Sequence, residues 1–354
     1  MNAARIPIAI LGATGAVGQR MIQLLANHPW FEIAILTGSD RTIGRPYGEL
    51  VRWVLDGAPP ANVANMIVQP SDVVADNVAI ALSALPTEAA KLYEPLWAAH
   101  TAVCSNASAY RMTNDVPLII PEVNPEHVNL IDDQRKARGW RGALVTNPNC
   151  SVIGIAMALK PLYDAVGLDI VHVATLQAVS GAGYPGVPSL DIIDNIVPNI
   201  ANGVEEEKIE AEPCKILGRY DNSAIAFAPM RMSAQVTRVP VTDGHTALIS
   251  LKSGRGLTVA DANAIYAGWQ APQIVRNLPS SPAQPLIIHS HPERPQPRRD
   301  RDLGAGMSVS IGRIRSCPIN DLRMVVLSHN TIRGAAGGAI LNAELLVAAG
   351  YAGK

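Results

Sequence analysis

The stretch IPIAILGATGAVG, residues 6–18, decides the fold of this chain. Residues Ile6 to Leu11 form an apolar run that ends at a glycine, which is the pattern of a buried strand. From Ala16 to Asn27 the apolar side chains recur at helical spacing, so a helix follows the strand directly. Glycines at positions 12, 15 and 18 lie at the junction, in the strand–turn–helix context that a dinucleotide-binding loop requires. Because G-x-x-G-x-x-G departs from the strict G-x-G-x-x-G, a glycine-rich turn without a ligand stays an alternative.

This loop is suited to the pyrophosphate of a nicotinamide dinucleotide, since glycines allow a close approach and a helix N-terminus favours negative charge. The residues expected to contact the cofactor here are Gly12, Thr14, Gly15, Ala16 and Val17. NAD sites place a carboxylate about 20 residues beyond the loop. In that region this chain has Ser39 and Arg41, which could hold a 2′-phosphate. NADP is therefore favoured, with Asp40 as the counter-indication if its side chain points inward.

The composition fits a helix-covered parallel sheet and excludes several classes of protein. Hydrophobic residues make up 48% of the 354 residues, with only two Phe, eight Tyr and five Trp, so the core must be aliphatic. Aliphatic strands are typical of sheets that are buried on both faces. The apolar fraction excludes intrinsic disorder. The formal net charge of −1 gives no electrostatic reason to bind nucleic acid or an anionic membrane, and we expect neither partner.

The N-terminus and the cysteines indicate a reduced, cytoplasmic protein. The N-terminus lacks the long apolar stretch and cleavage site of a signal peptide, and no window approaches the ~18 apolar residues of a membrane span. The four cysteines, at positions 104, 150, 214 and 317, match no paired zinc-ligand spacing, so we expect no metal. A chain of this length needs no disulfides, so we expect free thiols.

The pattern of predicted strands and helices differs between the first and second halves of the chain. Strands alternate with helices up to residue 166, which predicts βαβ units and a parallel sheet. The strands expected there are 31–36, 78–85, 102–104 and 143–146, and the helices are 87–100 and 151–166. Strands predominate beyond residue 168, which is typical of an α+β domain on a mixed sheet, before a last helix over 334–349. The strands expected there are 170–179, 236–241, 246–251, 307–315 and 323–328.

We also predict the conformation of two connecting segments in the second half of the chain. A turn that contains Asp243-Gly244 should join strand 236–241 directly to strand 246–251. Residues 279–302 are rich in Pro and Arg and should form an ordered loop or excursion, to which we assign no chemistry.

Cys150 is the cysteine best placed to react. It follows the segment NPN and opens the helix predicted over 151–166, so it lies where the helix dipole lowers the pKa of a thiol and free N–H groups stabilise an oxyanion. A purely structural thiol is the alternative. His245, at the start of a strand, is a candidate base, although a histidine at a turn is more often simply solvated. Arg238 lies within an apolar strand and needs an anionic partner, such as a ligand carboxylate.

Nine motifs occur in order between residues 6 and 349. They are GATGAVG, SNASAYRM, PLIIPEVNPEH, NPNCS, QAVSGAGYPG, EEEKIEAEPCKILG, SAQVTRVPVTDGHT, RPQPRRDRD and HNTIRGAAGGAILNAELL. Together they make the chain resemble the aspartate-semialdehyde dehydrogenase family, in particular its archaeal and fungal branch. The resemblance implies NADPH-dependent reduction of L-aspartyl 4-phosphate to L-aspartate 4-semialdehyde, with release of phosphate, in the biosynthesis of lysine, threonine and methionine.

The resemblance also implies a role for each motif residue. Cys150 would attack the acyl phosphate and form a thioester, His245 would receive the thiol proton and serve as acid and base, and Gln177 would orient the intermediate. The residues implied for the substrate are Arg238 for its carboxylate, Glu205 for its ammonium with Glu207 in reserve, Arg111 and Lys208 for the phosphate, and Asn149 beside the acyl group. The further cofactor contacts implied are Ser180, Gly181 and Asn330. Without the resemblance, a charge run such as 205–208 would be read as a solvated helix face.

The resemblance divides the chain into an NADP-binding Rossmann domain over 1–149, completed by the C-terminal helix in 330–354, and a catalytic and dimerisation domain over 150–329. It implies a homodimer or homotetramer. Malonyl-CoA reductase is the sister activity that would keep Cys150, His245 and Arg238, but it should not need an ammonium partner or a phosphate cradle. N-acetyl-glutamyl-phosphate reductase is disfavoured because its PGCY motif is absent. A non-catalytic nucleotide-binding paralogue should have lost the thiol or the base, and both are present.

Overall fold

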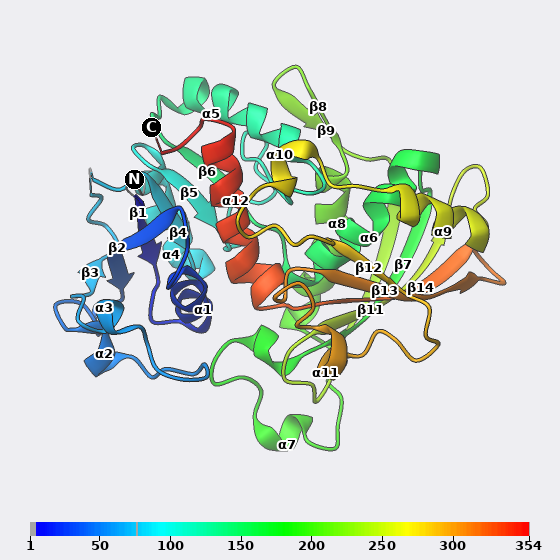
Figure 1. The fold of residues 1–354 in the computed structure, drawn as a ribbon, viewed down its shortest axis with the longest axis horizontal. Coiled ribbons are helices and arrows are strands. Elements are labelled where there is room, and N and C mark those ends of the chain that lie inside the picture. The colour runs from blue at the N-terminus through cyan, green and yellow to red at the C-terminus, as the bar shows by residue number, and fades with distance from the viewer. Residues whose placement is uncertain (1–4, 76, 354) are drawn as a thin grey trace.

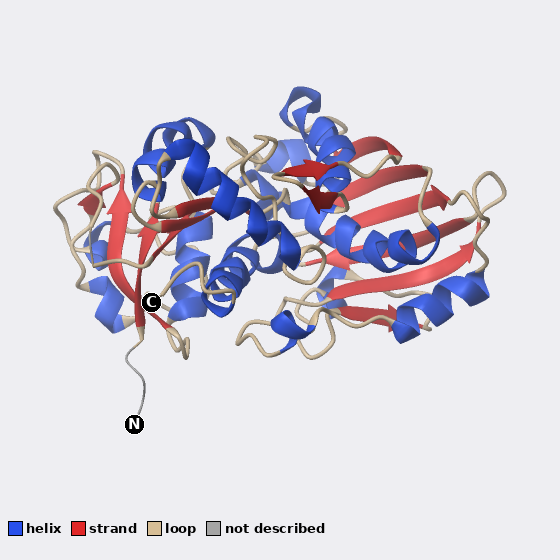
Figure 2. Ribbon diagram, turned by 90° about the horizontal axis from the view of Figure 1, so that it is seen from above, coloured by secondary structure: helices blue, strands red, loops and turns tan. Residues whose placement is uncertain are grey.

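The structure of the protein is a computed structural model that describes residues 5–75 and 77–353. These residues form two six-stranded sheets and a small two-stranded hairpin. The two large sheets lie at opposite ends of the molecule, one from the first part of the chain and one from the second (Figure 1). Seen from above, helices fill the region between them (Figure 2). None of the described helices is long and apolar enough to cross a membrane.

The first sheet is wholly parallel, in the order β3-β2-β1-β4-β5-β6. Its strands are β1 (Ile6–Leu11), β2 (Phe31–Gly38), β3 (Gln69–Pro70), β4 (Ile80–Ser83), β5 (Ala102–Ser105) and β6 (Ala143–Thr146). The strand order reverses between β1 and β4. Open α/β sheets bind ligands in the crevice outside the carboxyl ends of the strands at such a point.

Helices cover both faces of this sheet, which is why its strands are apolar throughout. On one face, α4 (Thr87–Ala98) packs on Ala9 and Leu11. On the other face, Ile8 and Ile10 pack with three helices, α1 (Ala16–Leu25), α5 (Leu130–Arg138) and α12 (Gly337–Ala348). Helix α12 contacts β4 and β5, so the end of the chain returns to the first sheet.

The second sheet is mixed, in the order β10-β7-β11-β14-β13-β12. Its strands are β7 (Ile170–Gln177), β10 (Arg231–Arg238), β11 (His245–Lys252), β12 (Leu286–His289), β13 (Val309–Ser316) and β14 (Leu322–Ser328). The pairs β10–β7 and β12–β13 are parallel, and the other neighbours are antiparallel. One face packs against α6 (Cys150–Val166), α8 (Val204–Ile216) and α9 (Val259–Gly268). The other face carries the exposed side chains of His172, Leu176 and Leu248.

The remaining elements are short. They are α2 (Tyr47–Leu50), α3 (Ala61–Ala64), α7 (Ser189–Ile192), α10 (Gln273–Arg276), α11 (Pro297–Asp300), the hairpin β8 (Arg219–Asp221) with β9 (Ala224–Ala226), the 3₁₀ turns Pro125–Asn129, Val179–Ala182 and Ala201–Gly203, and a π-helical turn, Ile332–Ala336.

The predicted α/β class with a parallel and a mixed sheet is confirmed, and the structure refines two local expectations. Strands β10 and β11 do not form a hairpin, because β7 lies between them. Their connection instead passes the end of β7, where the Val179 N–H donates to the Val241 carbonyl at 2.8 Å. The stretch 279–302 is more than a loop, since it contains β12 and α11; four residues were too few to stand out as a strand.

Candidate active site

Three neighbouring strands of the second sheet end at the same place and bring three polar side chains together. Gln177 is the last residue of β7, Arg238 is the last of β10, and His245 is the first of β11. Arg238 pairs directly with Gln177 in the parallel register, and β11 runs antiparallel to β7 beside it. All three side chains are buried. The displacement of β11 from β10 by one strand therefore places Gln177 between the arginine and the histidine.

Cys150 is the first residue of α6 and faces this cluster. Asn149 caps the helix, because its side-chain oxygen accepts the N–H of Ser151 at 2.8 Å. The Sγ atom of Cys150 lies 3.4 Å from Nε2 of His245. Gly334, in the π-helical turn, packs so closely that a Cβ there would lie 2.9 Å from both Cβ and the carbonyl oxygen of Cys150. The thiol is thus held in one place by its own helix cap and by a glycine behind it.

Burial disfavours the charged form of both members of the Cys150–His245 pair. The pKa of Cys150 is raised to about 12, mainly by burial and also by the carboxylate of Glu205, and nearby cations oppose this only in part. Burial lowers the pKa of His245 to about 3, assisted by Arg238 and His329. The predicted lowering of the thiol pKa is therefore wrong for this site, because burial raises this pKa more than Arg111, Arg238 and Lys208 lower it.

Gln177 links the arginine to a buried carboxylate. Nη1 of Arg238 donates to Oε1 of Gln177 at 3.3 Å and to the carbonyl of Ala178 at 2.9 Å. The amide nitrogen of Gln177 and that of Asn149 donate to Oε1 of Glu205, at 3.2 and 2.9 Å. The site thus holds a cation and an anion on either side of the Gln177 amide, close to the thiol.

The charge run at the start of α8 is not a solvated face. Glu205 is 6% exposed, and Nζ of the partly buried Lys208 lies 3.5 Å from its Oε2. Glu207, the reserve for the ammonium partner, is exposed instead. Because one helical turn separates residues 205 and 208, both side chains reach the same site, whereas residue 207 points to another face of the helix.

Arg111 lies at the site, but its guanidinium nitrogens already donate hydrogen bonds to other groups of the protein. Its Nε donates to the Asn147 carbonyl at 2.9 Å, and Nη2 donates to the Asn106 carbonyl at 2.8 Å. Nη1 lies 3.0 Å from Oε1 of Glu212. The other oxygen of Glu212 accepts the backbone N–H of Asn149 at 2.7 Å. Glu212 therefore connects the arginine to the residue that precedes the thiol.

Sequence reasoning missed Glu212 and also Lys215, one turn further along α8. Nζ of Lys215 is buried and donates to the carbonyls of Arg111, Thr113 and Val116, at 2.7, 2.8 and 2.8 Å. A signal was present, because the charged residues at 205, 208, 212 and 215 follow the three-and-four spacing of a single helix face. Only the packing shows that this face meets the first sheet's loops rather than solvent.

The crevice at the ends of β1 and β4 fits a dinucleotide. Gly12 has φ +77°, and a Cβ there would lie 2.9 Å from the carbonyl oxygen of Ala84. A Cβ on Gly18 would lie 2.5 Å from the Gly12 carbonyl oxygen, so both positions need glycine. Gly15 caps α1 without a side chain, which leaves room for an anion at the helix N-terminus. The partly buried residues of this loop are Thr14, Ala16 and Val17.

The two proposed 2′-phosphate contacts lie near this crevice. Ser39 and Arg41 are exposed residues that directly follow β2, and the loop after β1 is tied to that strand by the Ala13 N–H bond to the Thr37 carbonyl, at 2.9 Å. A serine and a free-standing guanidinium suit a phosphate better than they suit a ribose diol.

A cavity of about 230 Å³ separates the start of α1 from the loop after β7. Ser180 lines it, and its hydroxyl accepts the side-chain N–H of Asn330 at 2.8 Å. Because Asn330 also accepts the Gly244 N–H at 2.9 Å, it holds two loops together. Gly181 lies against the catalytic cluster, where an added Cβ would be 2.7 Å from Arg238 Nη1 and 3.0 Å from His245 Nε2.

Two protein families match this chain, one in the part that contains the first sheet and one in the part that contains the second sheet. Residues 7–131 match the family described as semialdehyde dehydrogenase, NAD binding domain. Residues 159–333 match semialdehyde dehydrogenase, dimerisation domain.

Full-length relatives extend the match. The chain is 49% identical to an aspartate-semialdehyde dehydrogenase of Archaeoglobus fulgidus, over 97% of this chain and 98% of the relative. It is 45% identical to that of Cryptococcus neoformans, over 98% of both chains. A crystal structure of aspartate semialdehyde dehydrogenase with NADP from Candida albicans superposes with a TM-score of 0.88 at 40% identity, covering 97% and 99% of the two chains. The chain belongs to the aspartate-semialdehyde dehydrogenase family.

Proposed function

We propose that this chain catalyses the NADPH-dependent reductive dephosphorylation of L-aspartyl 4-phosphate to L-aspartate 4-semialdehyde, a step in the biosynthesis of lysine, threonine and methionine. The observation that carries the proposal is the thiol of Cys150, 3.4 Å from His245 Nε2, at the helix N-terminus of a chain whose relatives carry that name. NADPH, when bound in the crevice of the first sheet, supplies the hydride that reduces the thioester. Splitting the reaction at a thioester avoids a direct reduction of the acyl phosphate.

The chain's own residues bind and orient the substrate. Arg238 and Glu205 lie on either side of Gln177 and match the carboxylate and the ammonium of an α-amino acid. Lys208 and Arg111 supply positive charge for the phosphate, and their charges act on the Cys150 thiol. Gln177 and Asn149 present amides to the acyl group, and His245 hydrogen-bonds the sulfur.

A buried carboxylate distinguishes this substrate from malonyl-CoA. Glu205 has no counterpart to pair with on a thioester of malonate, whereas an amino-acid substrate brings an ammonium group. The test is a panel of L-aspartate 4-semialdehyde with phosphate, and malonyl-CoA, each with both nicotinamide cofactors. We expect phosphate-dependent reduction of NADP⁺ with the semialdehyde. Turnover of malonyl-CoA with none of the semialdehyde would refute the assignment, and loss of activity in Cys150→Ala is the matched control for the thiol.

We also propose the division of the chain at residue 149, with the helix in 330–354 completing the first domain. The packing of α12 on β4 and β5 supports it; residues 1–4 and 354 lie outside the described residues. A cytoplasmic location is proposed on the ground that all four cysteines, which the described chain includes, are free thiols.

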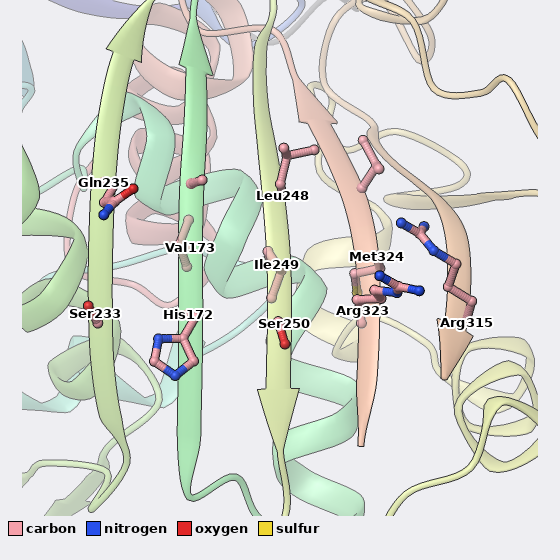
Figure 3. A pocket seen from close by; sticks show the side chains of 12 residues that line it. His172, Val173, Ser233, Gln235, Leu248, Ile249, Ser250, Arg315, Arg323 and Met324 are labelled. Carbon is pink, nitrogen blue, oxygen red and sulfur yellow. The ribbon is translucent and has the colours of Figure 1, made fainter. Parts of the chain in front are cut away.

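The open face of the second sheet is the proposed contact between subunits of a homodimer or homotetramer. Leu248 is 43% exposed on this face, between Ala174 of β7 and Val325 of β14. Polar side chains that include His172, Gln235 and Arg323 lie farther out on the same face (Figure 3). The match to a dimerisation domain supports this choice. Sedimentation of the wild type should give a dimer or tetramer. Leu248→Glu should dissociate it, and an unchanged mass for that variant would locate the interface elsewhere.

A further inference from the structure

The carboxylate of Glu212 joins two parts of the site that come from distant stretches of the chain. Its Oε1 lies 3.0 Å from Nη1 of Arg111, in the loop after β5. Its Oε2 accepts the backbone N–H of Asn149, directly before the thiol, at 2.7 Å. Glu212 and Arg111 are both buried, so these bonds are shielded from water. A single side chain therefore holds the arginine implied for the phosphate and the start of α6.

The contacts of Arg111 fix its guanidinium and leave part of it for a ligand. An arginine carries five N–H groups in one plane. Among the described residues, three of these groups are taken, by the carbonyls of Asn106 and Asn147 and by Glu212. Two N–H groups are left for an anion, and their directions are set by the other three.

Helix α8 carries this contact in register with the residues implied for the substrate. Glu205, Lys208 and Glu212 lie on one face of the helix at a spacing of three and four residues. One turn further, Nζ of Lys215 donates to three carbonyls of the loop that carries Arg111. The helix thus holds the backbone of this loop through Lys215 and the side chain of its arginine through Glu212.

We propose that Glu212 is a positioning residue for phosphate transfer, which keeps the guanidinium of Arg111 at a fixed place relative to the thiol of Cys150. This role rests on the proposed function and deepens it. It requires a carboxylate, because both of its oxygens accept hydrogen bonds, whereas an amide of the same shape offers one acceptor and one donor. In Glu212→Gln one of the two links is therefore lost whichever way the amide turns.

The role concerns the step in which phosphate reacts at the acyl carbon. In the direction of semialdehyde oxidation, Cys150 adds to the aldehyde, and hydride transfer to NADP⁺ leaves the thioester, NADPH and a proton. An oxygen of monohydrogen phosphate then attacks the acyl carbon, the C–S bond breaks with its electron pair, and the proton of the phosphate passes to sulfur. Because Arg111 is needed only in the second step, loss of the Glu212 bridge should slow that step and spare the first.

Rapid-mixing kinetics separate the two steps. Enzyme and NADP⁺ mixed with L-aspartate 4-semialdehyde should give a burst of NADPH without phosphate, and inorganic phosphate added afterwards should release aspartyl phosphate, which is measured by chemical quench. In Glu212→Gln the second rate at saturating phosphate should fall by about 10- to 100-fold, with the burst rate within about twofold of wild type, because a displacement on the order of 1 Å costs roughly 10²-fold.

Glu210→Gln is the matched control. Glu210 lies on the same helix, and its Oε1 accepts a backbone N–H too, that of Ala234 in β10 at 2.9 Å. Both rates should stay at the wild-type value in this variant. A slowed phosphate step in Glu210→Gln would show that any disturbance of α8 has this effect, and would overturn the role of Glu212.

Two results with Glu212→Gln itself would overturn the proposal. Equal slowing of the burst and of the phosphate step would reveal a general defect of the site. Removal of a carboxylate by itself favours anion binding, so a changed phosphate affinity with an unchanged rate at saturation would show that Glu212 adjusts charge and not position.

A double variant keeps the proposal testable if Glu212→Gln does not fold. Arg111→Met combined with Glu212→Gln buries no unpaired cation. Its phosphate step should be no slower than that of Arg111→Met alone, since Glu212 acts through the arginine, and a further loss of about tenfold would refute this. A wild-type enzyme that gives no burst with the semialdehyde would refute the proposed function instead.

Discussion

Gly181→Ala tests whether the geometry of the catalytic cluster is as tight as described. The new Cβ would lie 2.7 Å from Nη1 of Arg238, and 2.9 and 3.0 Å from Cε1 and Nε2 of His245, where ordinary contact begins near 3.4 Å. Arg238 cannot yield freely, because that same Nη1 is bonded to Gln177 and to the Ala178 carbonyl. One methyl group therefore displaces both the carboxylate-binding arginine and the histidine by a substantial fraction of an ångström.

A displacement on the order of 1 Å costs roughly 10²-fold in rate, which corresponds to about 2.7 kcal/mol of transition-state stabilisation. The expected result is a kcat/KM for L-aspartate 4-semialdehyde about 10²-fold below wild type, with KM raised through Arg238 and kcat lowered through His245. The assay is phosphate-dependent reduction of NADP⁺. Gly268→Ala is the matched control, because its Cβ would meet nothing within 4 Å. Wild-type kcat/KM in a Gly181→Ala protein of normal thermal stability would refute the described packing.

Three further substitutions test the packing behind the thiol, a buried carboxyl and a buried ion pair. Gly334→Ala places a Cβ 2.9 Å from the Cβ of Cys150, so kcat should fall by at least about tenfold with little change in the KM for NADP⁺ in steady-state kinetics. Burial raises the pKa of Glu94 to about 7, so the folded protein favours the protonated carboxyl, and its free energy of unfolding decreases as pH rises from about 4.5 through 7. In urea titrations Glu94→Gln should therefore be more stable than wild type by about 3 kcal/mol at pH 8 and equally stable at pH 4. Equal stability of the two proteins at both pH values would contradict this. Arg333→Met strands the fully buried Glu122, 2.6 Å away, and should cost about 3–5 kcal/mol in chemical unfolding, much of it recovered in the double variant with Glu122→Met.

The sequence predicts those parts of the fold that depend on local patterns. The run Ile6–Leu11 reappears unchanged as β1, and the helix expected from Ala16 begins there as α1. Apolar periodicity reports the burial of each segment, so it identifies strands and helices one at a time. The glycine at position 12 is equally readable, because its positive φ and its close approach to Ala84 admit no side chain. The motifs additionally predict the family of the chain, and the comparisons with known proteins confirm it.

The features that could not be predicted from the sequence depend on contacts between segments that are distant in the chain. The order β10-β7-β11 cannot be read from the turn at Asp243-Gly244, because the partner strand lies some 60 residues earlier in the chain. The prediction for the Cys150 thiol pKa rests on its helix alone, whereas the thiol is fully buried, is affected by Glu205 of α8 and contacts His245 of the second sheet. The contacts of Glu212 and Lys215 are made with Arg111 and the loop that carries it, which lies about 100 residues earlier in the chain.

In the proposed reaction, Cys150 forms an aspartyl thioester and expels phosphate before any reduction occurs. Mixing the enzyme with L-aspartyl 4-phosphate in the absence of NADPH tests it most directly, followed by phosphate determination and mass spectrometry of the digested protein. We expect one equivalent of phosphate per active site and an aspartyl group on the peptide that contains Cys150, with neither in Cys150→Ala. No phosphate release without NADPH from an enzyme that turns over with it, or an aspartyl group on another residue, would contradict it.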